Sequence, residues 1–218
     1  MLNSKKNYRV VFILLLIQWY GCNNGANDKA TTQHIKPDSS IFLENQNPYS
    51  PIDKSPMDMS YYPAEYPFLK ESGNDTVALI ARVIYSRPQL GGRAIFGDTA
   101  RGNSVILKYG DRWRMGANET TEIEFFRDVT IGGKKVMKGR YVLYCIPYPG
   151  KWTIVFNSNL YAWGRVMNPG KDILKTDVPV ITTDRNIEYF TMVFDKAPYG
   201  ADLIVLWGNL KAALPISF

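Results

Sequence analysis

The segment from Gly110 to Thr120 gathers the side chains best suited to hold a ligand. It joins two predicted strands, and loops carried on a rigid scaffold commonly hold function. Arg114 could bind a carboxylate or phosphate through its planar guanidinium, and Glu119 could act as an acceptor or general base. Trp113 offers a flat apolar platform. The predicted ligand-binding residues of this segment are Trp113, Arg114, Asn118 and Glu119.

Two further arginines, Arg87 and Arg93, are candidates for the same site, on which we expect them to converge. A structural explanation competes with ligand binding. Arginine and glutamate within one loop often pair with each other, and removing one partner of a buried pair costs about 3–5 kcal/mol. From the sequence alone, an ion pair between Arg114 and Glu119 is the preferred interpretation of these two side chains.

Two other groups of residues have a chemical and a structural interpretation. Tyr161 and Trp163 stand near asparagines and could stack against sugar rings, but we expect both rings in the core. Glu122 and Glu124 share one strand face and could be the carboxylate pair of a glycoside hydrolase. A solvated strand face explains the two glutamates more simply.

The composition excludes several chemistries. His34 is the only histidine and lies in the polar N-terminal part, so the folded domain has no Ser-His-Asp triad, Cys-His dyad or histidine-ligated zinc. Phosphate-loop, Gly-x-Gly-x-x-Gly and Ser-x-x-Lys motifs are missing too. We therefore predict no metal and no cofactor, and no catalytic residue is assigned. Cys145 lies in an apolar run and is predicted to be a buried small hydrophobe.

The N-terminus has the layout of a secretory signal peptide. Lys5, Lys6 and Arg9 precede the apolar stretch Val10–Ile17, which is too short to span about 30 Å of hydrocarbon. Gly21-Cys22 resembles the lipobox of bacterial lipoproteins, in which the cysteine carries the lipid. We expect a signal peptide over 1–21 and a lipidated, flexible tether over 22–47, with the protein held to a membrane of the cell envelope. The alternative is an ordinary signal peptide with an incidental cysteine.

The charge gives no support for nucleic-acid binding. The chain has 26 cations and 20 anions, and loss of the signal peptide leaves 23 cations, with no basic run longer than Lys134-Lys135. A phosphate-binding surface needs clustered charge. No nucleic-acid partner is therefore expected.

In the rest of the chain, short apolar runs separated by turn residues predict an all-β fold, an antiparallel two-sheet sandwich over 76–218. A Pro- and Tyr-rich stretch, 48–75, is expected to lie extended over this domain with Met57, Met59 and Tyr61 facing inward. Gly132-Gly133 predicts a hairpin turn. The expected strands are Thr76–Tyr85, Ser104–Tyr109, Thr121–Arg127, Val129–Ile131, Lys134–Val136, Arg140–Ile146, Trp152–Asn157, Asp177–Thr182, Glu188–Asp195 and Leu203–Trp207.

Four strings occur in a characteristic order: Tyr-Ser-Arg-Pro from Tyr85, Gly-Arg-Ala-Ile-Phe-Gly from Gly92, Trp-Arg-Met-Gly-Ala-Asn-Glu from Trp113 and Tyr-Ala-Trp-Gly from Tyr161. From about Pro56 to Phe218 the chain resembles the bacterial envelope proteins grouped as domain of unknown function 2911. The resemblance implies a β-rich domain, often in lipoproteins, and implies no activity.

Three functions remain open. The first is a non-enzymatic envelope lipoprotein that binds a small polar ligand or glycan at the Gly110–Thr120 loop. The second is a carboxylate-dependent hydrolase acting on saccharides, which needs two carboxylates about 5–10 Å apart across a cleft. The third is a structural or assembly protein of the envelope, which predicts an exposed apolar patch.

Overall fold

A computed structural model describes residues 54–74, 76–97, 105–163 and 167–218. All of them fall within one compact unit, Gln46–Phe218. The expected signal peptide, Cys22, and the tether to residue 47 lie outside the described residues. Among the described residues, no helix is long and apolar enough to cross a membrane.

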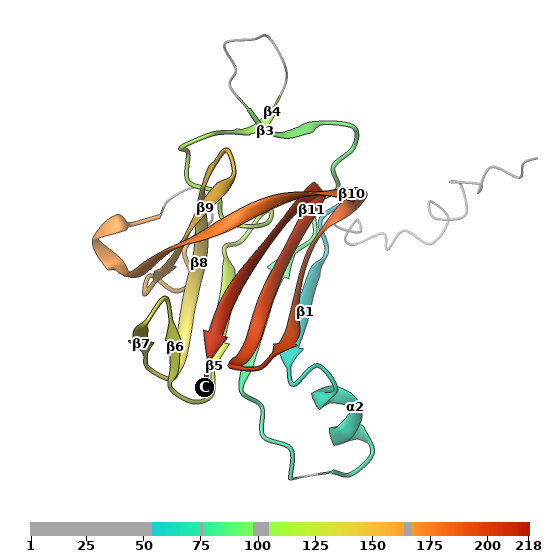
Figure 1. The fold of residues 1–218 in the computed structure, drawn as a ribbon, viewed down its shortest axis with the longest axis vertical. Helices are drawn as coiled ribbons and strands as arrows, with labels where there is room; N and C mark the ends of the chain where they lie inside the picture. The colour runs from blue at the N-terminus through green and yellow to red at the C-terminus, as the bar shows by residue number, and fades with distance from the viewer. Residues whose placement is uncertain (1–53, 75, 98–104, 164–166) are drawn as a thin grey trace, which may run out of the picture. The chain divides into compact units, whose positions relative to one another are not determined.

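Nine strands form one antiparallel sheet in the order β1-β2-β5-β8-β9-β10-β11-β6-β7 (Figure 1). The two remaining strands, β3 (Ala94–Gly97) and β4 (Val105–Lys108), make a small parallel pair. The strands of the large sheet are β1 Met57–Tyr62, β2 Ala81–Ser86, β5 Thr121–Phe125, β6 Val129–Ile131, β7 Lys134–Val136, β8 Gly139–Tyr148, β9 Lys151–Asn157, β10 Asp172–Ala197 and β11 Gly200–Ser217.

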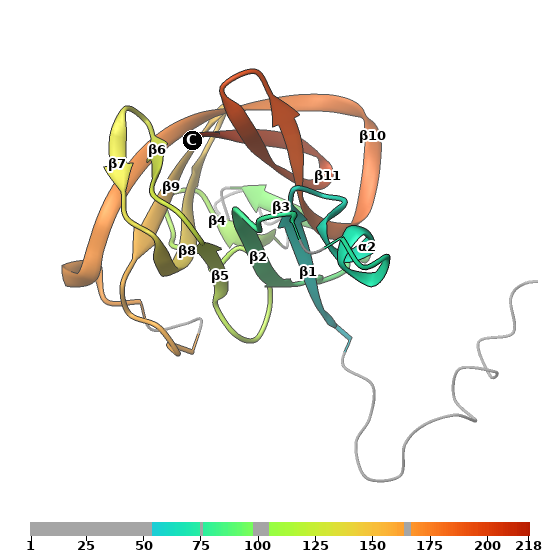
Figure 2. The ribbon, with the colours of Figure 1, turned by 90° about the horizontal axis from the view of Figure 1, so that it is seen from below.

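The large sheet curls because β10 changes partner along its length. Asp172 to Pro179 pairs with β9, whereas Val180 to Ala197 pairs with β11, with register shifts on either side of Ile187. Such irregularities bend a strand and increase its twist. Figure 2 shows β10 arching from β9 over to β11, with β1 and β2 on the opposite side. The strands thus form one curled sheet and a small pair, and the expected division into two antiparallel sheets is not seen.

The curled sheet encloses an aromatic core. Trp113 stacks on Trp207 with ring centroids 5.6 Å apart, and it meets Trp152 and Phe190 edge-on. Phe96 of β3 adds a ring that contacts both Trp113 and Trp152. These are the offset and edge-to-face arrangements that aromatic rings prefer. Cys145 is fully buried in this core, which confirms its predicted role as a small hydrophobe.

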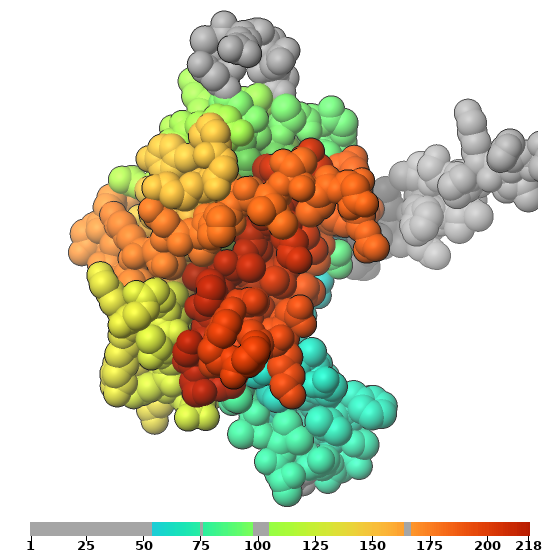
Figure 3. Space-filling model, in the orientation of Figure 1, coloured from blue at the N-terminus to red at the C-terminus, as the bar shows by residue number. Residues whose placement is uncertain are grey.

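The Pro- and Tyr-rich stretch differs from the expected extended cover. β1 pairs with β2 at the edge of the sheet, where proline-bounded strands are tolerated. Alternation along β1 turns Tyr62 toward Phe194, so that Met57 and Met59 are half exposed and their expected inward direction is wrong. A short helix, α2 (Tyr66–Glu71), follows; Pro67 is accepted there because it occupies the first turn. In Figure 3, α2 stands out beside the face formed by β10 and β11.

Candidate functional site

An open groove lies against the segment that the sequence singled out. Its volume is about 960 Å³. The floor and walls come from β4, from the chain between Gly110 and Gly116, from the end of β8 and from Met167. Arg112 and Arg114 are its two cations and Asp111 is the one carboxylate among its described lining residues. The apolar part of the described lining is Ile106, Leu107, Trp113, Ile146 and Met167, with Tyr148 beside them.

The backbone of this segment is fixed by the sheet. Trp113 and Cys145 exchange two backbone hydrogen bonds, at 2.7 and 2.8 Å, which place the chain beside β8. Gly110 donates to the carbonyl of Pro147 at 2.9 Å. Arg112 and Arg114, on either side of a tryptophan anchored in the core, consequently have their backbone positions fixed at the groove.

Most of the Trp-Arg-Met-Gly-Ala-Asn-Glu string is architectural. Trp113 and Met115 are 3% and 1% exposed, so the expected platform role of Trp113 is wrong: its ring is sealed in the core. A Cβ on Gly116 would lie 3.1 Å from the carbonyl oxygen of Ser86, a backbone atom that has little room to yield. Asn118 has φ 59°, a conformation that asparagine tolerates better than most residues. This string therefore specifies a close packing of loop on sheet, and Arg114 is its one groove-lining charge.

A buried polar cluster lies close to Arg112. Tyr144 is 1% exposed and its hydroxyl lies 2.8 Å and 2.9 Å from the two carboxylate oxygens of Asp172. Burial raises the pKa of Tyr144 and the Asp172 carboxylate raises it further, while the Arg112 guanidinium beside it opposes the rise. Tyr144 thus stays protonated and can donate to Asp172 while its oxygen faces the guanidinium of Arg112.

Asp172 is held as an anion by its other neighbours. Burial works to raise the pKa of this carboxyl, but hydrogen bonds from Asn157, Lys175 and Tyr144 outweigh it and keep the pKa below its ordinary value. Asn157 Nδ2 donates at 2.8 Å and Lys175 Nζ lies at 3.0 Å. Sequence reasoning missed this cluster. The available signal was the position of Tyr144, which alternation places on the sheet face opposite to Leu143 and Cys145.

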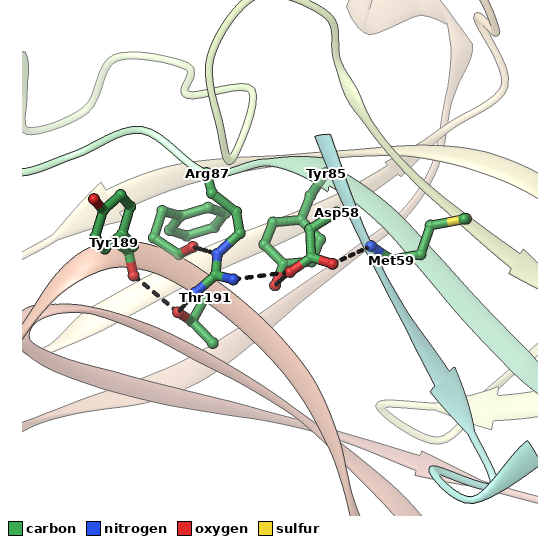
Figure 4. A network of polar contacts seen from close by, with 7 residues as sticks. Asp58, Met59, Tyr85, Arg87, Tyr189 and Thr191 are labelled. Atoms are coloured by element: carbon green, nitrogen blue, oxygen red, sulfur yellow. Dashed lines mark hydrogen bonds and ion pairs between the residues drawn. The ribbon is translucent and has the colours of Figure 1, made fainter. Parts of the chain in front are cut away.

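The other predicted residues do not converge on the groove. Arg87 forms an ion pair with Asp58 at 3.1 Å and donates to the carbonyl of Phe190 at 3.3 Å, with Thr191 Oγ1 at 3.4 Å. Figure 4 shows this guanidinium lying between β1 and β10. Arg93 closes its own turn by donating to the carbonyls of Leu90 and Gln89. Both arginines are occupied by the fold, away from the described lining of the groove.

Glu119 is exposed and is not part of the described groove lining. Its backbone forms an isolated antiparallel bridge with Trp163. Glu122 and Glu124 face outward on β5, where Arg82 lies 2.7 Å from Glu124 and Arg140 lies 3.5 Å from Glu122. The outward alternation is as expected, and the two glutamates are bound to arginines of the neighbouring strands.

Tyr161 and Trp163 are not in the core, contrary to expectation. Their side chains are 84% and 61% exposed. They lie on the connection between β9 and β10, which the Glu119 bridge joins to the groove segment. Among the described residues, no cluster of three or more histidine, cysteine, aspartate or glutamate side chains could hold a metal.

Comparison with protein families gives one match. The family model described as "Protein of unknown function (DUF2911)" covers residues 72–216. Comparison with curated proteins found no match, and comparison with solved structures found none either.

Proposed function

Since the chain belongs to the DUF2911 family, which brings no activity with it, we propose that this protein is a lipid-anchored envelope protein that binds a small anionic ligand in its groove. The observation that carries the proposal is the pair Arg112 and Arg114 in an open groove of about 960 Å³. Ligand pockets combine apolar walls with placed polar groups, and the described lining has both, with more polar than apolar surface.

The two arginines define the chemistry of the ligand. A guanidinium presents a planar set of donors that matches a carboxylate, sulfate or phosphate. Arg112 lies close to the buried Tyr144–Asp172 pair. With Asp111 as the single carboxylate beside two arginines, the described lining carries a net positive charge. These features favour a ligand that carries at least one acidic group.

The same lining weighs against the saccharide hydrolase. Glycoside hydrolysis needs two carboxylates on either side of the bond, and Asp111 has no carboxylate partner in the described lining. The third function, a structural or assembly protein of the envelope, needs an exposed apolar surface for its partners. Exposed apolar side chains such as Met57, Met59 and Phe68 lie on β1 and α2.

Titration calorimetry with D-glucuronate and inorganic sulfate tests the groove. We expect binding that weakens at least 10-fold in Arg112→Ala and Arg114→Ala, because a hydrogen bond to a charged group contributes about 1.5–3 kcal/mol. Arg185→Ala, which removes an exposed arginine of β10, is the matched control. Equal affinities in the parent and both groove variants, or no binding at all, would refute the proposed site.

The lipid anchor has its own test. Protein extracted from the membranes of its host is denatured and its free thiols are counted. A cysteine with diacylglycerol on its sulfur cannot react, so we expect Cys145 to give the one thiol. Two reactive thiols in the membrane-extracted protein would mean that Cys22 carries no lipid.

A further inference from the structure

The exposed rings of Tyr161 and Trp163 lie next to the groove but take no part in the core. The other three described tryptophans, Trp113, Trp152 and Trp207, are 3%, 1% and 1% exposed. Burying a large apolar side chain contributes about 1.5–3 kcal/mol, and this gain is forgone for Tyr161 and Trp163. The stability of the fold therefore does not explain why both rings on this connection are exposed.

The connection that carries the rings is held in place. Thr120 Oγ1 donates to the carbonyl of Ala162 at 3.1 Å, between the two aromatic residues, and Glu119 bridges Trp163. Lys171 Nζ donates to the side chain of Asn159 at 3.0 Å. The rings are therefore presented from an anchored backbone.

Tyr161 adds backbone strain to the same place. Its φ of 61° is a left-handed conformation that bulky side chains rarely adopt. Such conformations cost of order 1–3 kcal/mol and persist where the surrounding structure enforces them, often at ligand-binding positions. Here the strained residue directs an 84% exposed ring into solvent.

The aromatic pair and the arginine groove share the same two segments. Gly116 lines the groove three residues before Glu119, and Glu119 is bridged to Trp163. Strand pairing and the reach of three residues limit the distance between the Cα atoms of Trp163 and Gly116 to about 16 Å. Met167, on the same connection as Trp163, also lines the groove. One extended ligand can therefore reach both places.

Flat, exposed aromatic faces match a sugar ring, whose C–H face is apolar and whose edge is polar. Nucleic-acid bases also stack on aromatic rings, but a chain with 23 cations and 20 anions beyond its predicted signal peptide lacks the clustered charge that a phosphate backbone needs. The combined chemistry favours an acidic saccharide.

Resting on the proposed function, we infer that Tyr161 and Trp163 form a second subsite, and that the ligand is an acidic oligosaccharide. A charged sugar unit lies against Arg112 and Arg114, and a neighbouring unit stacks on the aromatic pair. The arginines recognise the acidic group of the sugar, and the rings make a longer oligosaccharide bind more tightly than a single sugar.

The test compares D-glucuronate with a glucuronate-containing tetrasaccharide by titration calorimetry on the full chain. We expect the tetrasaccharide to bind at least 10-fold more tightly, and Trp163→Ala and Tyr161→Ala to remove that gain while leaving the affinity for glucuronate unchanged. Phe68→Ala, which removes a 70% exposed ring on α2, is the matched control and should change neither affinity. Because all three side chains are exposed, these variants should keep the melting temperature of the parent.

A second readout follows Trp163 directly. It is the one exposed tryptophan among the described residues, so the fluorescence difference between the parent and Trp163→Phe reports on it. The tetrasaccharide should protect this signal from quenching by iodide, and glucuronate should not.

The outcomes separate the two proposals. A tetrasaccharide that binds no more tightly than glucuronate, or a gain that survives in Trp163→Ala, overturns the second subsite and leaves the groove standing. Tight binding of an oligothymidylate that depends on Trp163 also overturns it, in favour of a nucleic-acid ligand. If neither sugar binds the parent, the proposed function fails and the subsite fails with it.

Discussion

At the scale of single residues, position within the Gly110–Thr120 segment decides which side chains can meet a ligand. Trp113 and Met115 are committed to the core, while Arg112 and Arg114 reach the groove from the intervening positions. Alternation around the bridged Trp113 places Arg112 and Arg114 on its other side, and Met115 returns to the core through a left-handed backbone with φ 55°. The sequence places four candidate residues in one short loop, and the backbone directs some of them into the core and others to the surface.

Glu119→Gln should change the free energy of unfolding by less than about 0.5 kcal/mol, as surface substitutions usually do. The side chain is exposed, and the link from residue 119 to Trp163 runs through the backbone, which the substitution retains. Urea denaturation of the two proteins measures the difference. A loss of about 3 kcal/mol would instead identify Glu119 as half of a buried ion pair.

The carboxyl of Asp172 should make stability depend on pH. Its folded pKa lies below its ordinary value, so the folded state favours the anion. The resulting stabilisation is present at pH values above about 4, the pKa in the unfolded chain, and is lost as pH falls through the folded pKa. Asp172→Asn should therefore cost about 1–3 kcal/mol at pH 7.

The difference between Asp172→Asn and the parent should shrink progressively below about pH 4. Denaturation of both proteins between pH 2 and pH 7 measures it. Tyr144→Phe is a useful companion, because it removes one donor to Asp172 and keeps the charge. A difference that is constant with pH would show that the carboxylate is not stabilised by its neighbours.

At the scale of elements, β1 is held by more than its pairing with β2. Arg87 ties Asp58 of β1 to the backbone of β10, and Phe194 N lies 3.4 Å from Ser60 Oγ. The edge strand is thereby clamped between its neighbour in the sheet and the returning end of β10.

Arg87→Ala should destabilise the fold by about 1–2 kcal/mol, a modest value because the guanidinium and Asp58 are both more than a third exposed. Hydrogen exchange should locate the effect: the amides of β1 lose protection while those of β8 and β9 do not. Arg185→Ala serves as the control. If the amides of β8 and β9 lose as much protection as those of β1, Arg87 supports the whole core and not this clamp.

Sequence patterns predicted most strands of the fold. The β6–β7 hairpin follows from Gly132 and Gly133, whose φ angles of 55° and 75° are those of a tight hairpin turn. The continuity of β10 was missed: Thr183 to Asn186 has the composition of a turn, yet the structure accommodates it as an irregularity within one strand. The β3–β4 pair was also missed in part, because a parallel pair of short strands has no tight hairpin turn to signal it.

A groove lies along Gly110–Thr120, the segment that loop chemistry singled out, and of the candidate residues only Trp113 and Arg114 belong to its described lining. Sequence could not show that Arg87 is used elsewhere, because that depends on where β10 returns, nor that Arg93 folds back onto the carbonyls of its own turn. It also could not show that Tyr161 and Trp163 are exposed, since an aromatic pair in a β-protein is ordinarily core.

At the scale of the whole molecule, the core shields the Cys145 thiol. Burial raises its pKa well above the ordinary value, and the side chain is inaccessible, so the reactive thiolate is scarce and hidden. We expect Cys145 to react with a thiol reagent only through opening of the core, at a rate that rises with urea in parallel with global unfolding. A Cys22→Ser variant isolates the signal. Rapid labelling in native buffer would contradict a closed core.

The stacking of Trp207 on Trp113 also determines when the aromatic core can form during synthesis of the chain. The two rings meet at the centre of the core although one enters the chain about a hundred residues after the other, and such distant contacts slow folding. A ribosome that has released the polypeptide only as far as β10 holds an unfinished sheet, with Trp113 and Phe96 lacking the β11 side of their packing. The aromatic core can therefore be completed only after β11 has been made. Until β11 emerges, Trp113 lacks its stacking partner Trp207 and the aromatic core stays incomplete.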